Sequence, residues 1–299
     1  MIKITTNQDH VDVRLDKFLC QEFDISFGLA QKLIREKKIK VNDARVPLAY
    51  KLNDLDEITI FSDLSKRQEH QKKKPKISPQ KIKNFLATVI YRDENLVAIN
   101  KPSGLATQGG SLIDISVDDL IPYLKTDEKQ ETPQLVHRLD KDTSGILLIA
   151  LNKKTAELLT AAFKSKTISK TYLALVHGVV KKDSGTINIA LQKKFIGKTE
   201  KVYPDFENGK EAITHFKVVR RYFDNTLLEL NPITGRTHQI RVHCKEMGHA
   251  IINDIKYGGK EVMNKKLSDR MCLHALQIKL RDYYGKELII ATKKPNFTK

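Results

Sequence analysis

The chain has 299 residues, of which 40% are hydrophobic and 30% charged, so it has room for two domains with packed cores. It has no apolar run near the roughly 20 residues that span a bilayer, no signal-peptide pattern and three widely separated cysteines, so we expect a cytoplasmic protein without membrane attachment. An excess of 53 Lys and Arg over 36 Asp and Glu, a net charge of +17, favours a polyanionic partner such as nucleic acid, although a merely basic cytosolic protein has the same balance.

Residues 12–63 predict a small domain of two helices and short strands. In RLDKFLCQEF the apolar side chains recur at helical spacing, and Ser26 is a candidate N-cap for a second helix in SFGLAQKLIREKKIKV. Short strands are expected in IKVN, ARVPL and DEITIF. The exposed side of the second helix and the residues after it are basic, at Lys32, Arg35, Lys37 and Lys38.

The order RLDKFL, LIREKKIKVN, DEITIF resembles the S4 RNA-binding domain over residues 12–63. The resemblance implies that the basic second helix lies against RNA phosphates. A solvated charged helix face is the alternative explanation of the same lysines and arginine. Residues 64–84 are rich in lysine, contain two prolines and lack apolar periodicity, so we expect a basic linker.

Residues 85–299 predict a larger α+β domain. Strands are expected on both sides of the polar turn in VIYRDENLVAINKP, in GILLIAL and in KTYLALVHG, and a helix capped by Asn152 separates the last two. Three further strands precede a helix opened by Thr237 and closed by Gly248, and two strands finish the chain. Because most strands follow one another as hairpins, we expect a mixed, largely antiparallel sheet flanked by helices.

Several kinds of chemistry are not supported by any motif. The chain has no G-x-G-x-x-G, no P-loop and no G-x-S-x-G nucleophile elbow, which argues against a bound nucleotide and against a serine hydrolase. His238, His243, Cys244 and His249 suggest zinc, but His238 and His243 are five residues apart and would share a helix face poorly. We therefore expect no metal and no cofactor.

One carboxylate stands out in LVHRLDKDTSGILLIA, where Asp140 lies on a turn that leads into an apolar strand. An aspartate so placed is a candidate nucleophile or general base, activated by a nearby guanidinium that lowers its pKa through a two-point hydrogen bond. Surface turn residues would give the same pattern, and these residues alone leave the catalytic and structural interpretations balanced.

A second segment, NPITGRTHQIRVH, favours the catalytic interpretation. It predicts a tight turn, with Arg236 at the entrance of a helix that projects His238, Gln239 and Arg241. Such a corner suits an oriented arginine that pairs with a carboxylate or holds a phosphate. Arginines on a solvated helix are the alternative.

Taken in order, NKPSGLA, HRLDKDTSGILL, KTYLALVHG and PITGRTHQIRVH resemble the motifs of the RluA-type family of RNA pseudouridine synthases, from about Val89 to the C-terminus. The resemblance implies that Asp140 is the nucleophile and that Arg241 pairs with it and keeps it ionised. It implies that Tyr172 stacks on the target uracil and is a candidate acceptor of the C5 proton at the end of the reaction. It further implies that Arg138 fills the RNA stack when the uridine flips out and that Ile240 is an apolar wall. Further candidates for substrate contact are His137, Arg236 and Lys101, the last chiefly as a residue that shapes the backbone.

The expected function is the isomerisation of specific uridines to pseudouridine in bacterial 23S ribosomal RNA, by a monomer that needs no cofactor. The same chemistry on another ribosomal or transfer RNA remains open. So do two other classes of protein: a non-catalytic S4-type RNA-binding or assembly protein, and a base-excision glycosidase, which would admit water and release free uracil.

Overall fold

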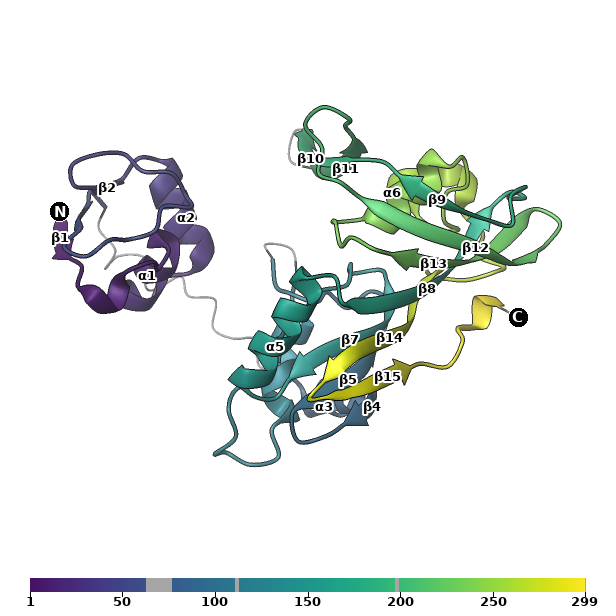
Figure 1. Ribbon diagram of the computed structural model, residues 1–299, viewed down its shortest axis with the longest axis horizontal. Helices are drawn as coiled ribbons and strands as arrows, with labels where there is room; N and C mark the ends of the chain where they lie inside the picture. The colour runs from purple at the N-terminus through teal and green to yellow at the C-terminus, as the bar shows by residue number, and fades with distance from the viewer. Residues whose placement is uncertain (63–76, 111–112, 197–198, 299) are drawn as a thin grey trace. The chain divides into compact units, whose positions relative to one another are not determined.

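The chain divides into two compact units, residues 1–75 and residues 76–299 (Figure 1). The computed structural model describes residues 1–62, 77–110, 113–196 and 199–298. Most of the expected linker, residues 64–76, lies outside this described part. The remainder of the expected linker differs from the prediction, because helix α3 (Pro79–Leu86) begins there with Ser78 as its N-cap and proline in its first turn.

The N-terminal unit packs two helices, α1 (Leu15–Phe23) and α2 (Phe27–Arg35), beside a three-stranded antiparallel sheet. The sheet has the order β1 (Ile2–Thr5), β3 (Glu57–Ile60), β2 (Ile39–Val41). The unit therefore starts before residue 12, since β1 pairs with β3. The strand expected in ARVPL is wrong: Ala44 makes a single bridge to Val41, and proline in this segment lacks the N–H that a ladder needs.

The two predicted helices of this unit are confirmed, and both turn their apolar side chains into one core. The Ser26 hydroxyl accepts a hydrogen bond from the backbone N–H of Leu29, so the predicted N-cap is also confirmed. Asp16 is fully buried between the helices and accepts hydrogen bonds from Arg14 and Gln31. The basic side of α2 thus stands on a rigid helical pair.

The C-terminal unit is built on a ten-stranded mixed sheet. The strands of this unit, including a separate β10–β11 hairpin, are β4 (Val89–Arg92), β5 (Leu96–Lys101), β6 (Gln134–Leu135), β7 (Ser144–Ala150), β8 (Ile168–His177), β9 (Ser184–Asn188), β10 (Leu191–Ile196), β11 (Thr199–Pro204), β12 (Ile213–Arg221), β13 (Asn225–Pro232), β14 (Leu273–Tyr283) and β15 (Lys286–Ala291). The main order is β4-β5-β7-β14-β8-β13-β12-β9, with β15 beside β14 and β6 beside β7. Among these described pairs β7 and β14 are parallel and the others are antiparallel, which confirms the expected mixed, largely antiparallel α+β fold.

Helices cover the two halves of this sheet separately (Figure 1). After α3 they are α4 (Val117–Leu120), α5 (Lys153–Lys164), α6 (Gln239–Glu246) and α7 (Ile255–Gly258). Helix α5 packs on β7, and the Asn152 side chain caps it by accepting from the N–H of Thr155, as predicted. Helix α6 packs on β13 in the other half. Every residue of β7 is buried, so this strand runs through the middle of the core.

The start of β7 approaches β14 unusually closely. Gly145 has a φ of +110°, and a Cβ at this position would lie 2.2 Å from the carbonyl oxygen of Ala275. A side chain cannot be accommodated there, so the glycine after TS in the DTSG motif lets the parallel pair form. The turn that carries Asp140 therefore enters the sheet at a point where the backbones of β7 and β14 leave no room for a side chain.

None of the helices in the described part of the chain combines the length and the apolar character that a membrane span requires.

Candidate active site

The loop that carries Asp140 connects β6 to β7 and is held by the segment that follows β5. The Lys101 ammonium is fully buried and donates to the backbone carbonyls of Pro102, Leu105 and Lys141 at 2.9, 2.7 and 3.1 Å. The Thr107 hydroxyl donates to the carbonyl of Leu139 at 2.7 Å and accepts from its N–H. The NKPSGLA segment is thus the frame on which the Asp140 turn rests, and Lys101 acts through the backbone.

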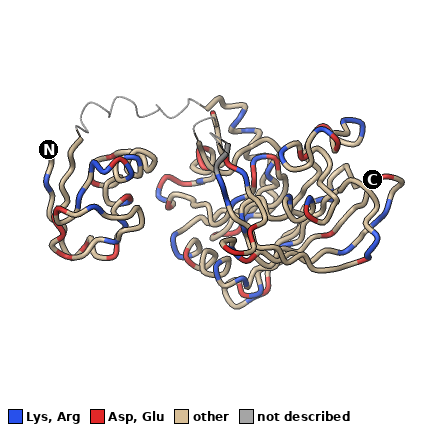
Figure 2. Tube along the Cα trace, turned by 90° about the horizontal axis from the view of Figure 1, so that it is seen from above, with Lys and Arg blue, Asp and Glu red and all other residues tan. Residues whose placement is uncertain are grey.

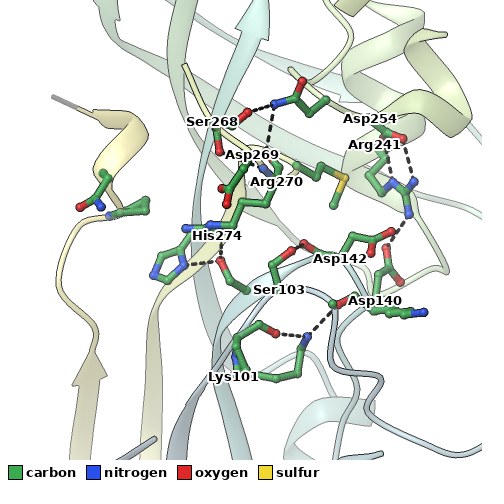
Figure 3. A pocket seen from close by; sticks show the side chains of 18 of the residues that line it. Lys101, Ser103, Asp140, Asp142, Arg241, Asp254, Ser268, Asp269, Arg270 and His274 are labelled. Carbon is green, nitrogen blue, oxygen red and sulfur yellow. Dashed lines mark hydrogen bonds and ion pairs between the residues drawn. The ribbon is translucent and has the colours of Figure 1, made fainter. Parts of the chain in front are cut away.

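An arginine placed between two carboxylates forms the centre of the site (Figure 3). Arg241, on α6, donates from Nε and Nη2 to both carboxylate oxygens of Asp254 at 2.7 Å. Its remaining nitrogen, Nη1, lies 3.6 Å from Oδ2 of Asp140. The side chains of Arg241 and Asp254 are 6% and 1% exposed, so the pair is buried, whereas the Asp140 side chain keeps 19% exposure.

This geometry corrects the expected arrangement in one respect. The sequence predicted a two-point hydrogen bond from an arginine to Asp140, whereas the two-point partner of Arg241 is Asp254 and Asp140 receives one longer contact. The expected lowering of the Asp140 pKa is also wrong. Burial raises the pKa of Asp140, and the guanidinium groups of Arg241 and Arg138 offset this rise only in part.

His238 approaches the other oxygen of Asp140 from the N-terminal end of α6. The Tyr257 hydroxyl accepts the N–H of Val202 and lies 2.7 Å from Nδ1 of His238, to which it can give its own proton. Burial lowers the pKa of His238 to about 3, so the ring is neutral at neutral pH. Its Nε2 lies 3.9 Å from Oδ1 of Asp140.

The segment TGRTHQIRVH divides its side chains between the site and the scaffold. His238 is the N-cap of α6 and has a φ of +53°, a left-handed conformation that is unusual for a residue with a side chain. The helix begins at Gln239, later than the start that the sequence predicted at Thr237. Gln239 is buried and bonds to Thr234, Thr214 and the backbone around them. Gly248, with a φ of +85°, follows the helix as predicted. The turn and helix therefore present Arg241 rigidly.

Asp140 lies where two concave regions meet. The first, which we call the inner cavity, has a volume of about 500 Å³. Seven of the residues expected at the site line it: His137, Arg138, Asp140, Tyr172, Arg236, Ile240 and Arg241. Side chains from the β6–β7 loop, β8 and α6, which are distant in sequence, are thus brought together as the sequence predicted. The volume of this cavity lies within the range of pockets that bind small organic ligands.

The second region, which we call the outer groove, is larger, at about 1330 Å³, and shares Arg138, Asp140, His238 and Arg241 with the inner cavity. Nine basic residues and four acidic residues line it (Figure 3). The basic ones are Lys101, Arg138, Lys141, Arg241, Lys256, Lys265, Arg270, Lys293 and Lys294. The surplus of positive charge makes the groove attractive to a polyanion, and the partly buried Asp140 lies where the groove meets the inner cavity.

Two inner-cavity residues have surroundings that restrict what they can do. His137 accepts the N–H of Leu148 through Nε2 at 2.8 Å and stacks on Phe163, and burial lowers its pKa to about 3. It is therefore a neutral wall residue rather than a cation. Burial raises the pKa of Tyr172, with a contribution from Asp140, so this phenol stays protonated at neutral pH.

The two arginines at the rim differ. Arg236 donates from Nε to the carbonyl of Glu211 at 3.0 Å, and its own backbone N–H is held by Gln239. Arg138 is exposed, and among the described residues its guanidinium donates no hydrogen bond. Arg138 is thus the freer of the two to reach a ligand.

In the N-terminal unit the basic residues on and after α2 are exposed or half-exposed, but they are not equally free. Glu36 lies 3.6 Å from the ammonium of Lys32 and 3.0 Å from that of Lys38. Arg35 and Lys37 have no ion pair among the described residues. Figure 2 shows that lysine and arginine are spread over both units.

Sequence reasoning missed Asp254 and Tyr257. Both lie just after NPITGRTHQIRVH, in the segment IINDIKYGG, where an aspartate and a tyrosine on a short turn have no distinguishing pattern. Their importance comes from the fold, which places α7 beside α6. A buried arginine requires a charged partner, and that requirement was the one signal from which an unassigned acidic residue could have been inferred.

Comparison with known proteins gives consistent matches in both units. The model of the RNA pseudouridylate synthase family matches residues 95–246, and the S4 domain model matches residues 13–58. The first of these contains Asp140, Tyr172 and Arg241.

The matches extend over nearly the whole chain. The ribosomal large subunit pseudouridine synthase C of Rickettsia felis is 40% identical over 293 residues, which cover 95% of this chain and 94% of that protein. The protein of the same name from Vibrio parahaemolyticus is 34% identical, covering 93% and 88%. Among solved structures, human RNA pseudouridylate synthase domain containing 4 has a TM-score of 0.61 at 26% identity and covers 72% of this chain and 92% of that chain.

The buried position of the Arg241–Asp254 pair predicts a large stability effect. Asp254→Ala leaves a buried guanidinium without its partner, so we expect the free energy of unfolding of the C-terminal unit to fall by about 3–5 kcal/mol. The matched control is Asp183→Ala, because Asp183 pairs with Arg221 at the same 2.7 Å but is 88% exposed. Losing that surface pair should cost about 1 kcal/mol or less. If denaturant titrations show equal losses of unfolding free energy in the two variants, burial does not make the Arg241–Asp254 pair important for stability.

The surroundings of Asp140 predict how it titrates. With its folded pKa raised, the carboxyl should ionise at a pH above the ordinary aspartate value of about 3.9, and Arg138→Gln should move the midpoint higher still, because one cation is removed. Carboxyl ¹³C NMR, with the Asp140 signal assigned by its absence in Asp140→Asn, measures both midpoints. An ordinary midpoint in the wild type, or a downward shift in Arg138→Gln, would show that desolvation does not dominate.

Proposed function

Since the chain belongs to the RNA pseudouridylate synthase family, an assignment that confirms the resemblance of its motifs, we propose that this pseudouridine synthase acts on uridines of bacterial 23S (large-subunit) ribosomal RNA. The observation that carries the proposal is the position of Asp140. It is the carboxylate at the junction of the inner cavity and the basic outer groove, with the buried guanidinium of Arg241 beside it. The choice of RNA follows the names of relatives that this chain matches over nearly its full length.

The reaction needs little beyond such a carboxylate. The bond between N1 of uracil and C1′ of ribose breaks, the base turns within the site, and a bond forms between C5 and C1′. The hydrogen on C5 leaves as a proton and N1 gains one, so atoms and electrons balance without an oxidant or a second substrate. We propose that ionised Asp140 is the nucleophile and that Arg241 stabilises its negative charge.

The inner cavity suits the base, and its walls suggest separate roles. We assign the aromatic face of Tyr172 to stacking on the uracil, a contact worth about 1–3 kcal/mol per base, and Ile240 to the apolar wall that keeps the ring in place while it turns. As a protonated phenol, Tyr172 is also able to donate a hydrogen bond. His137 closes the cavity, and Arg236 stands at its rim.

A uridine within an RNA helix reaches such a cavity by leaving the stack, which costs a few kcal/mol. Arg138 borders both the inner cavity and the outer groove, and its guanidinium is exposed. A planar guanidinium stacks on neighbouring bases as well as pairing with phosphate. We propose that Arg138 occupies the place that the flipped uridine leaves.

The N-terminal unit supplies affinity for RNA in this proposal. Its S4 family match includes α2, and the cations on and after α2 face solvent. We propose that Arg35 and Lys37 contribute most to phosphate binding, because Lys32 and Lys38 already share Glu36. RNA would have to displace that carboxylate before it gained their full charge.

Asp140→Asn tests the catalytic role directly. On a large-subunit rRNA transcript carrying tritium at C5 of uridine, wild-type protein should release tritium to water and Asp140→Asn should release essentially none, while RNA affinity persists. Asp183→Asn is the control, since Asp183 is exposed and lines neither the inner cavity nor the outer groove; it should retain turnover. Substantial turnover by Asp140→Asn would remove Asp140 from the nucleophile role, and free uracil as the product would indicate a glycosidase instead.

Arg35→Gln tests the role of the S4 unit. Removing one phosphate-binding cation should weaken RNA binding and reduce the slope of log affinity against log salt by about one. Lys51→Gln in the same unit should change the slope less, because Lys51 is already paired with Asp12 at 3.0 Å. Fluorescence titrations between about 50 and 200 mM salt give both slopes. An unchanged slope for Arg35→Gln would place the RNA elsewhere.

A further inference from the structure

The outer groove contains a second anchored arginine, outside the machinery described above. Arg270 precedes β14, and its guanidinium lines the groove together with Lys293 and Lys294 from the segment after β15 (Figure 3). Its backbone is fixed, because its carbonyl accepts from Asn253 and its N–H donates to the Ser268 hydroxyl. The ring of Phe297 lies 5.6 Å from the guanidinium carbon.

What holds the guanidinium is a chain of buried neutral groups. Nη1 of Arg270 donates to the Ser144 hydroxyl at 2.6 Å, and that hydroxyl lies 2.8 Å from Nδ1 of His274. Nε2 of His274 lies 2.6 Å from the Thr292 hydroxyl, which in turn donates to the carbonyl of Leu276. Ser144 and His274 are 4% and 3% exposed.

This hydrogen-bond chain holds Arg270 without adding a charge of its own. Ser144 accepts from the arginine, and its own proton can go to Nδ1 of His274 or to the backbone carbonyl of Leu273, 3.4 Å away. Burial, reinforced by the charge of Arg270, lowers the pKa of His274 to about 4, so the imidazole is neutral at neutral pH. The chain ends on a backbone carbonyl and contains no carboxylate. It fixes the position of Arg270 without neutralising its charge.

Arg270 is therefore a cation with unused donors. Among the described residues it has no ion pair, and the Ser144 contact is the one hydrogen bond from its guanidinium. Asp269 is adjacent in the chain and lines the groove, but it forms no ion pair with Arg270 among those residues. A fixed guanidinium with free N–H groups matches the oxygens of a phosphate better than a mobile lysine does.

We propose that Arg270, held by the Ser144–His274–Thr292 hydrogen-bond chain, is a binding site for one phosphate of the substrate RNA backbone in the outer groove. The RNA strand would then contact the protein on both sides of Asp140, with Arg138 at the inner cavity and Arg270 farther along the groove. Ser144 directly follows the Asp140 turn and begins β7, so the same end of β7 positions both this phosphate-binding site and Asp140. This inference rests on the proposed function for its choice of RNA as the ligand.

A structural tie between β7 and β14 is the competing explanation of the same contacts, and charge separates the two. Arg270→Gln keeps an amide that can donate to Ser144 but removes the positive charge, whereas Arg270→Lys keeps the charge. Arg281→Gln is the control, since Arg281 is an exposed arginine on β14 that does not line the groove. Fluorescence titrations of a large-subunit rRNA transcript at several salt concentrations measure the affinity of each variant.

If Arg270 binds a phosphate, Arg270→Gln reduces the slope of log affinity against log salt by about one. Arg270→Lys keeps the wild-type slope, and so does Arg281→Gln. Arg270→Gln also raises KM for pseudouridine formation and leaves kcat unchanged, because a remote phosphate contact is made equally in the ground and transition states. A wild-type slope in Arg270→Gln overturns the proposal. If the wild type binds this RNA but forms no pseudouridine, the proposed function is wrong, and the salt slopes still show whether Arg270 binds a phosphate.

Ser144→Ala gives a second answer that does not depend on Arg270→Gln folding. Ser144→Ala retains the charge of Arg270 but releases its guanidinium, so we expect the salt slope to persist and RNA affinity to fall several-fold. A melting curve checks that the variant is folded at the temperature of the titration. Inorganic phosphate, added at constant ionic strength, should compete less with Ser144→Ala than with wild type. Unchanged RNA affinity and unchanged phosphate competition in Ser144→Ala would contradict the claim that the chain positions Arg270.

Discussion

The site depends on one buried ion pair, between Arg241 and Asp254. An arginine with 6% exposure needs a charged partner, and Asp254 satisfies two of its nitrogens at 2.7 Å. The third nitrogen is left to face Asp140 at 3.6 Å. Asp140 is consequently next to a positive charge that does not move and is not fully used. Had Asp140 been the two-point partner, its oxygens would be occupied and less available as a nucleophile.

Desolvation and charge act in opposite directions on Asp140, and their balance suits the nucleophilic role that we propose for it. Burial raises the pKa of the carboxyl, while Arg241 and Arg138 restrain the rise. A carboxylate that is ionised but poorly solvated is a stronger nucleophile than one in water, provided that fixed dipoles and charges replace the water. Neutral His238 lies beside Asp140 without adding a charge, and the Tyr257 hydroxyl holds its ring at Nδ1.

The fold explains why these groups stay in register. The Asp140 turn is held by buried Lys101 on one side and runs into β7 at Gly145, where no side chain fits against β14. Ser144, one residue earlier, anchors Arg270 in the outer groove. A shift of the turn would therefore disturb the β7–β14 pair, so the carboxylate is positioned by the core of the sheet and not by a surface loop.

Local patterns predicted much of this, since they record interactions between near neighbours in sequence. Apolar periodicity located α1 and α2, Ser26 and Asn152 marked the starts of α2 and α5, and hairpin spacing indicated a largely antiparallel sheet. The motifs also indicated that Asp140, Tyr172 and Arg241 belong to one site, and in the structure all three line the inner cavity. Asp254 could not be found in this way, because its link to Arg241 exists only once α7 packs beside α6. The left-handed backbone of His238 was not predicted either. Helix α3 was missed for a different reason: the lysine-rich composition indicated a linker, although Ser78 and Pro79 are local signals of a helix start.

The central claim, that Asp140 makes this chain an rRNA pseudouridine synthase, is tested most directly in cells. Pseudouridines are mapped in large-subunit ribosomal RNA from cells that lack the protein, and again after wild-type or Asp140→Asn protein is supplied. The account predicts that specific pseudouridines disappear without the protein, return with the wild type and stay absent with Asp140→Asn. An identical map with and without the protein, or full recovery with Asp140→Asn, would contradict it.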